Sequence, residues 1–249
     1  MKCLSPCAAL LPTLSAALSA AMTAAMSAAA ADGSCTAQSA AIAPTVVELY
    51  TSEGCSSCPP ADRWLSTLKG RPDVLALSFH VTYWDRLGWP DRFARPEYTQ
   101  RQYTLAQQAG RANVYTPQVL VNGQDWRRWP QLPVPTAAEA PALSLARDGE
   151  VVTLTVAPAA ASKQRWAGHW VVLEDGHQSR VNAGENAGET LKHDHVVRQF
   201  QPVAAWAAAA GQKHQLRVSR GDANFPRRVA FIVVDAASQK PLQAATLGC

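Results

Sequence analysis

The feature that most restricts the fold of this chain is a Cys-x-x-Cys pair between a strand-like and a helix-like segment. Residues 46–60 read VVELYTSEGCSSCPP, in which an apolar, β-branched run precedes a short polar turn and the two cysteines. The prolines after Cys58 suit the first turn of a helix, because early helical positions do not use their backbone N–H groups. The free N–H groups and the positive end of the helix dipole favour a thiolate there. The pattern predicts a redox-active dithiol at the start of a helix.

A second segment supports this interpretation. Residues 114–123 read VYTPQVLVNG, a Thr-Pro pair followed by an apolar strand and an Asn-Gly turn. In thioredoxin-like proteins a cis proline in such a segment lies beside the cysteine pair, so residues 46–129 resemble a thioredoxin-fold domain. The resemblance implies that Pro117, with Thr116 before it, holds the backbone of a substrate next to the sulfur atoms.

Longer strings are similar to one particular family. Residues 48–62, residues 78–89 (SFHVTYWDRLGW) and residues 184–191 (GENAGETL) carry the similarity. They resemble the DUF1223 family, which comprises secreted, thioredoxin-like bacterial proteins without an assigned biochemical role. The resemblance covers nearly all of the chain after its N-terminal segment, and it implies a fold but no substrate.

The N-terminal segment, residues 1–31, is typical of a signal peptide. Lys2 precedes a run rich in Ala and Leu, and three alanines at 29–31 come directly before Asp32. The run is only weakly apolar, so we expect no stable membrane anchor and a periplasmic or secreted protein. The whole chain has 23 Lys and Arg against 19 Asp and Glu. Because this bias is weak and no basic run is present, we expect no nucleic-acid partner.

Four of the six cysteines remain after such a segment is removed, because Cys3 and Cys7 lie within it. Export places the chain in an oxidising compartment, where cysteines are usually paired. The simplest pairing is Cys55 with Cys58 as the active pair and Cys35 with Cys249 as a structural disulfide. The alternative leaves Cys35 or Cys249 as a resolving thiol for the active pair.

The fold class that we predict is α/β, with a thioredoxin-like domain followed by a smaller, antiparallel β-rich domain. The first domain spans residues 32–147 and contains the Cys-x-x-Cys pair. From residue 130 the composition shifts to Pro and Ala, and short β-prone runs separated by turn signals follow. We therefore assign residues 148–249 to a β-rich domain of unknown role. Residues 182–189 repeat a short Gly-containing unit and are interpreted as a turn-rich loop that contacts the first domain.

The chemistry expected of the cysteine pair is thiol-disulfide exchange with a protein thiol or disulfide, together with an unidentified redox partner. Cys55, at the helix N-terminus and less buried, is the expected nucleophile. Cys58, deeper in the helix, is the expected resolving thiol. Ser56 and Ser57 stabilise a thiolate only weakly, and the charge of Glu53 raises the pKa of the Cys55 thiol. We therefore expect an intermediate reduction potential for the cysteine pair.

Three further residues complete the predicted site. Glu48, a carboxylate in an apolar strand, is a candidate to carry the proton of Cys58, although by its spacing from the cysteines Leu49 aligns better with the acid of thioredoxin-like proteins. A surface position for Glu48 on an alternating strand is equally compatible with the pattern. Tyr83 and Trp84 are candidates to contact an extended polypeptide substrate, although core packing also explains aromatic residues there.

For the thiol-disulfide oxidoreductase we expect no cofactor. Two other functions remain open at this stage. Cys55, Cys58 and His80 match the soft ligand set of a copper-binding chaperone, since thiolates and imidazole suit Cu(I). A lone histidine at the end of a strand is more often structural. The third interpretation is a binding protein without catalytic activity, in which the Cys55–Cys58 disulfide is purely structural.

Overall fold

The computed structural model describes residues 35–134, 140–219 and 221–249. The signal peptide expected for residues 1–31 lies outside the described residues. These described residues belong to one compact unit. Within the described ranges, no helix has the length and apolar character needed to cross a membrane.

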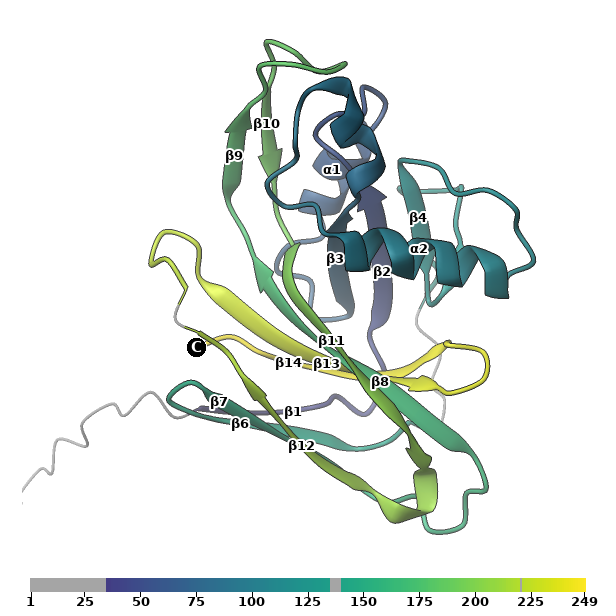
Figure 1. Ribbon diagram of the computed structural model, residues 1–249. Helices are drawn as coiled ribbons and strands as arrows, with labels where there is room; N and C mark the ends of the chain where they lie inside the picture. The colour runs from purple at the N-terminus through teal and green to yellow at the C-terminus, as the bar shows by residue number, and fades with distance from the viewer. Residues whose placement is uncertain (1–34, 135–139, 220) are drawn as a thin grey trace, which may run out of the picture. The chain divides into compact units, whose positions relative to one another are not determined.

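One large mixed sheet contains most of the strands (Figure 1). Strands that pair in parallel form its centre, and antiparallel strands flank them on both sides. In spatial order the strands are β14 (Pro241–Leu247), β13 (Arg227–Asp235), β8 (Arg165–Glu174), β11 (Val196–Ala207), β3 (Val74–His80), β2 (Thr45–Thr51), β4 (Gln118–Val121) and β5 (Gln124–Asp125).

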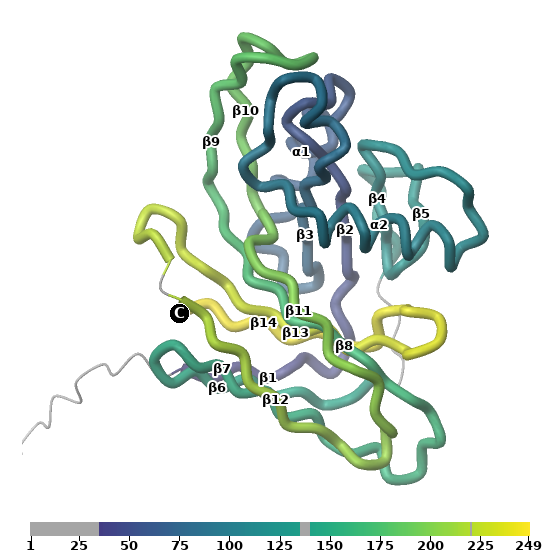
Figure 2. Tube along the Cα trace, in the orientation of Figure 1, coloured from purple at the N-terminus to yellow at the C-terminus, as the bar shows by residue number. Residues whose placement is uncertain are grey.

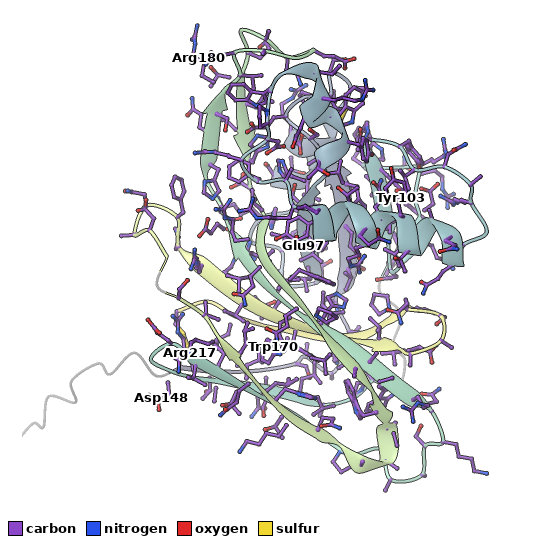
Figure 3. All side chains as sticks on the ribbon, viewed as in Figure 1. Glu97, Tyr103, Asp148, Trp170, Arg180 and Arg217 are labelled. Atoms are coloured by element: carbon purple, nitrogen blue, oxygen red, sulfur yellow. A yellow bond between two sulfur atoms is a disulfide. The ribbon has the colours of Figure 1, made fainter. Side chains whose placement is uncertain are left out.

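A smaller antiparallel sheet covers one face of the β8, β11, β13 and β14 half of the large sheet. It consists of β1 (Cys35–Gln38), β6 (Leu143–Asp148), β7 (Val151–Val156) and β12 (Gln212–Arg217). The core between the two sheets is rich in large side chains such as Trp166, Trp170 (labelled in Figure 3) and Phe231. Two facing sheets with interdigitated apolar side chains are the arrangement of a β-sandwich.

Two α-helices cover the opposite faces of the large sheet around β2 and β3. Helix α1 (Pro59–Ser66) packs on Val47 and Leu49, and α2 (Pro96–Gln108) lies on the face of Val46 and Tyr50. Successive residues of a strand point to opposite faces of the sheet. Because a helix covers each face at β2, all residues of this strand are buried. The other helices among the described residues are two short 3₁₀ segments, η1 (Thr82–Leu87) and η2 (Ala208–Ala210).

A two-stranded hairpin, which we call the arm, extends beside α1 (Figure 2). It comprises β9 (His177–Arg180), β10 (Thr190–His193) and the tip between them, residues 181–189. The strands follow β8 and precede β11 directly, so the arm is a continuation of the central part of the large sheet. This connection brings the tip to the cysteine end of α1.

The predicted α/β class with a thioredoxin-like domain is wrong. Strands hold 42% of the described residues and helices 14%, so the chain is mostly β-structure. Strands from the C-terminal half join β3 in the same sheet, and β1 pairs with β6. The boundary expected after residue 147 falls within β6, whose hairpin partner is β7. Pairing between strands far apart in the chain therefore determines the architecture.

Candidate functional site

The two cysteines lie where β2 leads into α1. Strand β2 ends at Thr51, the chain turns through residues 52–57, and Cys58 is the residue that precedes the first turn of the helix. Cys55 and Cys58 form a disulfide with their Cα atoms 5.5 Å apart. Both cysteines have no exposed surface, although Ser56 and Ser57 between them are exposed. The expected difference in burial between the two cysteines is therefore absent.

The Thr116–Pro117 segment lies directly against Cys55. The peptide bond between Thr116 and Pro117 is cis, and the Thr116 hydroxyl donates to the Cys55 Sγ at 3.3 Å. The same hydroxyl accepts a hydrogen bond of 2.7 Å from the Trp84 indole Nε1. Four residues predicted for the site, from three separate parts of the chain, thus come together at one point.

Tyr83 lies one step further out. Its ring centroid is 6.4 Å from that of Trp84, and its hydroxyl donates to Gln102 on α2 at 3.3 Å. Burial raises the pKa of Tyr83 to about 12, so the phenol is neutral and acts as a hydrogen-bond donor. The structure describes no contact between Tyr83 and the cysteines.

Glu53, in the turn before Cys55, is completely buried. Trp89 donates to its Oε2 at 2.7 Å, and the His193 Nε2 of the arm lies 3.2 Å from Oε1 in a geometry that does not align as a hydrogen bond. Burial acts to raise the pKa of Glu53, but the neighbouring His193 and Trp89 more than offset it, and the pKa lies below its usual value. A negative charge is therefore held close to Cys55.

His80 and Asp91 form a buried ion pair behind this turn. The His80 Nδ1 is 2.6 Å from the Asp91 Oδ2, and both side chains are fully buried. Burial opposes charge on both groups, yet the mutual attraction raises the pKa of His80 and lowers that of Asp91 to about 2. Asp91 also accepts the backbone N–H of Glu53 at 2.9 Å, so the pair fixes the turn that carries Cys55.

The copper-binding interpretation finds no support in the arrangement of these residues. Within residues 35–134, 140–219 and 221–249, no group of three or more His, Cys, Asp or Glu is placed to hold a metal ion. His80 is engaged by Asp91, and Cys55 and Cys58 are bonded to each other.

Asp62 is a residue of the site that the sequence analysis missed. It lies on α1, where its backbone N–H donates to the Cys58 carbonyl at 3.1 Å, and residues spaced in this way lie on the same side of a helix. Its carboxylate accepts a hydrogen bond of 3.0 Å from Thr51. Burial raises the pKa of Asp62. The signal for it was available, because Asp62 follows Cys58 by one helical turn and is flanked by Ala61 on the buried face.

A small pocket connects this carboxylate to the arm. Its volume is about 130 Å³, and Asp62 and His193 line it together with Pro59, Arg63 and residues 190–192. Neither ring nitrogen of His193 has a hydrogen-bond partner among the described residues. The pocket therefore contains ionisable groups on the side of α1 that faces the arm.

The structure does not bring Glu48 to the cysteines. Glu48 points to the α2 face of β2, where the Arg101 Nη1 lies 2.8 Å from its Oε2. The Tyr50 hydroxyl donates to the same oxygen at 3.2 Å. Glu48 is neither close to Cys58 nor exposed on the surface; it is half of a buried ion pair.

The tip of the arm is bonded to the cysteine turn. The Glu185 carboxylate accepts hydrogen bonds from the Ser56 backbone N–H at 3.0 Å and from the Ser56 hydroxyl at 2.8 Å. The Asn186 side-chain amide donates to the carbonyls of Glu53 and Cys55, both at 2.9 Å. The contact expected of residues 182–189 with the N-terminal half of the chain is thus present, and it is made with the turn that carries Cys55.

The second predicted disulfide, Cys35–Cys249, is also present. It links the first residue of β1 to the C-terminal residue, with Cα atoms 6.6 Å apart. It lies at the small sheet, away from the Cys55–Cys58 pair. Its position leaves neither cysteine available as a resolving thiol.

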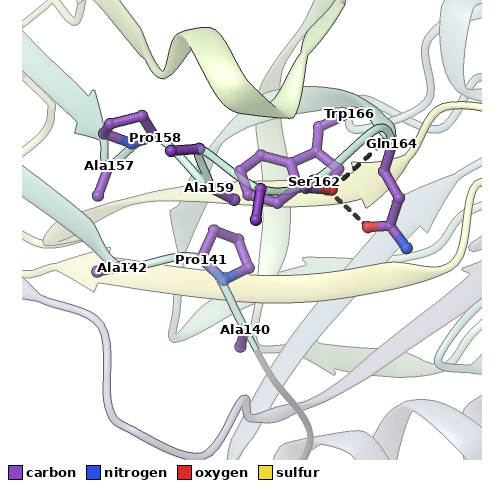
Figure 4. Close-up of a pocket in the computed structure, with 11 residues that line it drawn as sticks. Ala140, Pro141, Ala142, Ala157, Pro158, Ala159, Ser162, Gln164 and Trp166 are labelled. Atoms are coloured by element: carbon purple, nitrogen blue, oxygen red, sulfur yellow. Dashed lines mark hydrogen bonds between the residues drawn. The ribbon is translucent and has the colours of Figure 1, made fainter.

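A larger hollow elsewhere in the molecule has no chemical features of a site. It has a volume of about 650 Å³ and is lined mainly by Ala and Pro, with Ser162, Gln164 and Trp166 at one side (Figure 4). None of its described lining residues is ionisable. The cysteine turn is therefore the better candidate for a functional site.

Comparison with known proteins agrees with the resemblance found in the sequence. The model of the family DUF1223, described as "Protein of unknown function", matches residues 46–234. No curated protein matches the chain.

Two solved structures are similar. One is the crystal structure of protein AGR_C_4864 from Agrobacterium tumefaciens, a structural-genomics target, with 28% identity over 82% of this chain and 93% of that chain and a TM-score of 0.62. The other is HBP35 of Porphyromonas gingivalis, with 14% identity over 84% of this chain and 76% of that chain and a TM-score of 0.52. The second likeness concerns the fold alone.

Proposed function

Since the chain belongs to the DUF1223 family, whose function is unknown, we propose its function from the site itself: it is an exported thiol-disulfide oxidoreductase that uses the Cys55–Cys58 couple. The observation that carries the proposal is the contact of 3.3 Å between the Thr116 hydroxyl and the Cys55 Sγ. A hydrogen-bond donor aimed at a sulfur atom stabilises a thiolate. A disulfide with a solely structural role does not require one.

The reaction in the reducing direction has two exchange steps. The Cys55 thiolate attacks one sulfur of a substrate disulfide, so that a mixed disulfide forms and the other substrate sulfur leaves as a thiolate. The Cys58 thiolate then attacks the Cys55 sulfur, which closes the Cys55–Cys58 disulfide and releases the second substrate thiolate. Two electrons pass from the dithiol to the substrate, and the protons of the two thiols end on the products. The oxidising direction is the reverse sequence.

Asp62 is the residue that we assign to the proton of Cys58, in place of Glu48. A buried carboxyl with a raised pKa accepts a proton more readily than an exposed one, and the pKa of Asp62 is raised by burial. Because Asp62 follows Cys58 by one helical turn, its carboxyl and the resolving thiol belong to the same side of α1. Glu53, with a lowered pKa, keeps its charge and opposes a thiolate at Cys55.

The test is a redox titration of the intact chain in buffers of reduced and oxidised glutathione, followed by alkylation and mass spectrometry. We expect the Cys55–Cys58 couple to titrate as a two-electron step while Cys35–Cys249 stays oxidised. In the Cys58→Ser variant, glutathione should accumulate as a mixed disulfide on Cys55. A mixed disulfide that accumulates only on Cys58, in the Cys55→Ser variant, would refute the assigned roles.

The burial of both sulfur atoms favours a second candidate function. A cysteine pair without exposed surface is typical of a structural disulfide in a binding protein. The same titration separates the two, because such a disulfide stays oxidised across the glutathione series in the folded chain.

A further inference from the structure

The tip of the arm occupies the polar backbone groups around the cysteines. On the redox turn, the N–H of Ser56 and the carbonyls of Glu53 and Cys55 are all bonded to Glu185 or Asn186. An incoming extended polypeptide would pair with backbone groups of this kind. The tip therefore takes the place that part of a substrate would need.

The side chains that make these contacts are suited to a reversible contact. Glu185 is exposed, and hydrogen bonds from Ser56 lower the pKa of its carboxyl, so it is ionised at neutral pH. Asn186 is buried at 6% exposure, and Val181 at the base of the tip is also buried, whereas the other residues of the tip are half-buried or exposed. One buried amide and one exposed carboxylate thus make the side-chain hydrogen bonds between the tip and the cysteine turn.

The tip is an internally bonded unit with a firmly packed base. Within it, the Val181 N–H donates to the Glu189 carbonyl at 2.9 Å, and the Gly188 N–H donates back to Val181 at 2.8 Å. At the base, His177 and His193 pack their rings against Phe93. The tip can therefore move as one piece while β9 and β10 stay anchored.

We propose that residues 181–189 are a cap that closes the cysteine turn, and that the Cys55–Cys58 pair reacts only when Glu185 and Asn186 release it. This accounts for two cysteines without exposed surface beside exposed serines. The inference deepens the proposed function, on which its meaning for catalysis rests. A substrate protein would open the site by replacing the bonds of the tip with its own.

The experiment measures how fast dithiothreitol reduces each disulfide of the folded, full-length chain. Samples are quenched with an alkylating reagent, and mass spectrometry distinguishes Cys55–Cys58 from Cys35–Cys249. The variants are Asn186→Ala, which removes the hydrogen bonds to the carbonyls of Glu53 and Cys55, and Glu185→Ala, which removes the two hydrogen bonds from Ser56. The matched control is Glu189→Ala, an exposed carboxylate of the same tip.

We expect Cys55–Cys58 to be reduced about 30-fold faster in Asn186→Ala, which corresponds to the loss of two neutral hydrogen bonds. Glu185→Ala should also be faster, whereas Glu185→Gln, which keeps an acceptor for Ser56, should stay closer to the unaltered chain. Glu189→Ala should match the unaltered chain. The rate for Cys35–Cys249 should be the same in every variant.

Two results would overturn the cap. One is a reduction rate of Cys55–Cys58 that, in Asn186→Ala and in Glu185→Ala, stays within twofold of the rate in Glu189→Ala. The other is equal acceleration of both disulfides, because this indicates general loosening of the fold. Dithiothreitol reduces a disulfide whether or not it is catalytic, so failure of the cap is distinct from failure of the oxidoreductase in the glutathione titration.

Discussion

Asp62 is the side chain on which the proposed proton transfer depends, so its replacement by the isosteric Asn is a sharp test. We expect Asp62→Asn to slow the step in which Cys58 displaces glutathione from Cys55, because the amide cannot accept the thiol proton. Loss of a general base typically costs about 10²-fold or more. Rapid-quench measurement of glutathione release checks this.

Thr51→Val is the control for that experiment. It removes the hydrogen bond to Asp62 but leaves the carboxylate, so it should change the rate far less than Asp62→Asn. Equal rates for Asp62→Asn and the unaltered chain would show that the proton leaves by another route.

Arg101 provides a second prediction at the scale of single residues. Its guanidinium bonds to the Tyr50 hydroxyl at 2.6 Å and forms an ion pair with Glu48. Arg101→Met leaves the Glu48 charge buried without its partner, which typically costs about 3–5 kcal/mol. Urea unfolding should show this loss, and the double variant Glu48→Gln with Arg101→Met should recover most of it. A double variant as unstable as Arg101→Met would contradict the explanation.

Glu48 and Asp62 also show how far single residues could be placed from the sequence. The pairing of Cys55 with Cys58 was predicted from a motif whose local geometry is strongly restricted. The proximity of Thr116, 61 residues from Cys55, was predicted only from the resemblance to thioredoxin-like proteins. The roles of the two acids were not, because the face to which Glu48 points depends on which side of β2 each helix packs. Tertiary contacts, here the ion pair with Arg101 on α2, determine that face. The alternation of residues along the strand does not indicate it.

At the scale of elements, β8 is the strand that pairs with both β11 and β13. Gly168 lies on β8 where β13 comes close to it. A Cβ at Gly168 would clash with the Phe231 ring and lie 2.8 Å from the Ile232 carbonyl oxygen. We expect Gly168→Ala to destabilise the fold by about 1–3 kcal/mol, as overpacking of a core does. Thermal unfolding measures the effect.

The comparison for Gly168 is Gly176→Ala, in the turn between β8 and β9. Gly176 has open space around it and a φ of +78°, so only the cost of a left-handed conformation applies, about 1–2 kcal/mol. If Gly168→Ala unfolds at the temperature of the unaltered chain, the crowding at β8 is relieved by small shifts of β13.

The strands themselves were largely recognisable as elements, but their partners were not. The runs that became β2, β3, β4, β7, β8 and β13 all have β-branched or alternating patterns. Val196 of β11 pairs with Ser78 of β3, and nothing in either run indicates the other. Because strand pairing is non-local, a division at residue 147 that followed composition could not show that one sheet contains strands from both sides.

At the scale of the whole molecule, the Cys35–Cys249 disulfide closes the longest loop available to the described chain. Its sequence separation is 214 residues, for which chain-entropy reasoning gives up to about 5 kcal/mol, against about 2 kcal/mol for a Cys-x-x-Cys loop. We expect Cys35→Ala with Cys249→Ala to lower the free energy of unfolding by more than Cys55→Ala with Cys58→Ala. Guanidinium unfolding of the two double variants measures both losses. A larger loss in Cys55→Ala with Cys58→Ala would contradict the expectation.

The stability of the molecule should also fall in acid. Burial, with the nearby Arg228, lowers the pKa of His195 to about 4, and burial lowers the pKa of His169 and His177 as well. An unfolded histidine has a pKa of about 6.5, so the unfolded chain binds more protons as the pH falls from about 6.5 to about 4. His195 alone accounts for at most about 3 kcal/mol of this loss.

His80 acts in the opposite sense, because its raised pKa gives stability that is retained in acid and lost at higher pH. Urea unfolding at about pH 7.5 and about pH 4.5 should nevertheless show a lower free energy at the acidic value. In His195→Asn the difference in free energy of unfolding between the two pH values should shrink, because the titrating imidazole is removed. Asn is the suitable replacement because it tolerates the φ of +57° at this position. An undiminished difference would assign the acid sensitivity to other groups.

The bond between Cys35 and Cys249 makes the polypeptide between them a covalent ring. A force applied to the two ends of that stretch would pass through two sulfur atoms and bypass every strand and helix. A single proteolytic cut in a surface loop would leave one linear molecule, with its new termini at the cut, instead of two fragments. The ring thus protects the folded chain from stretching and from separation into fragments after a single cut.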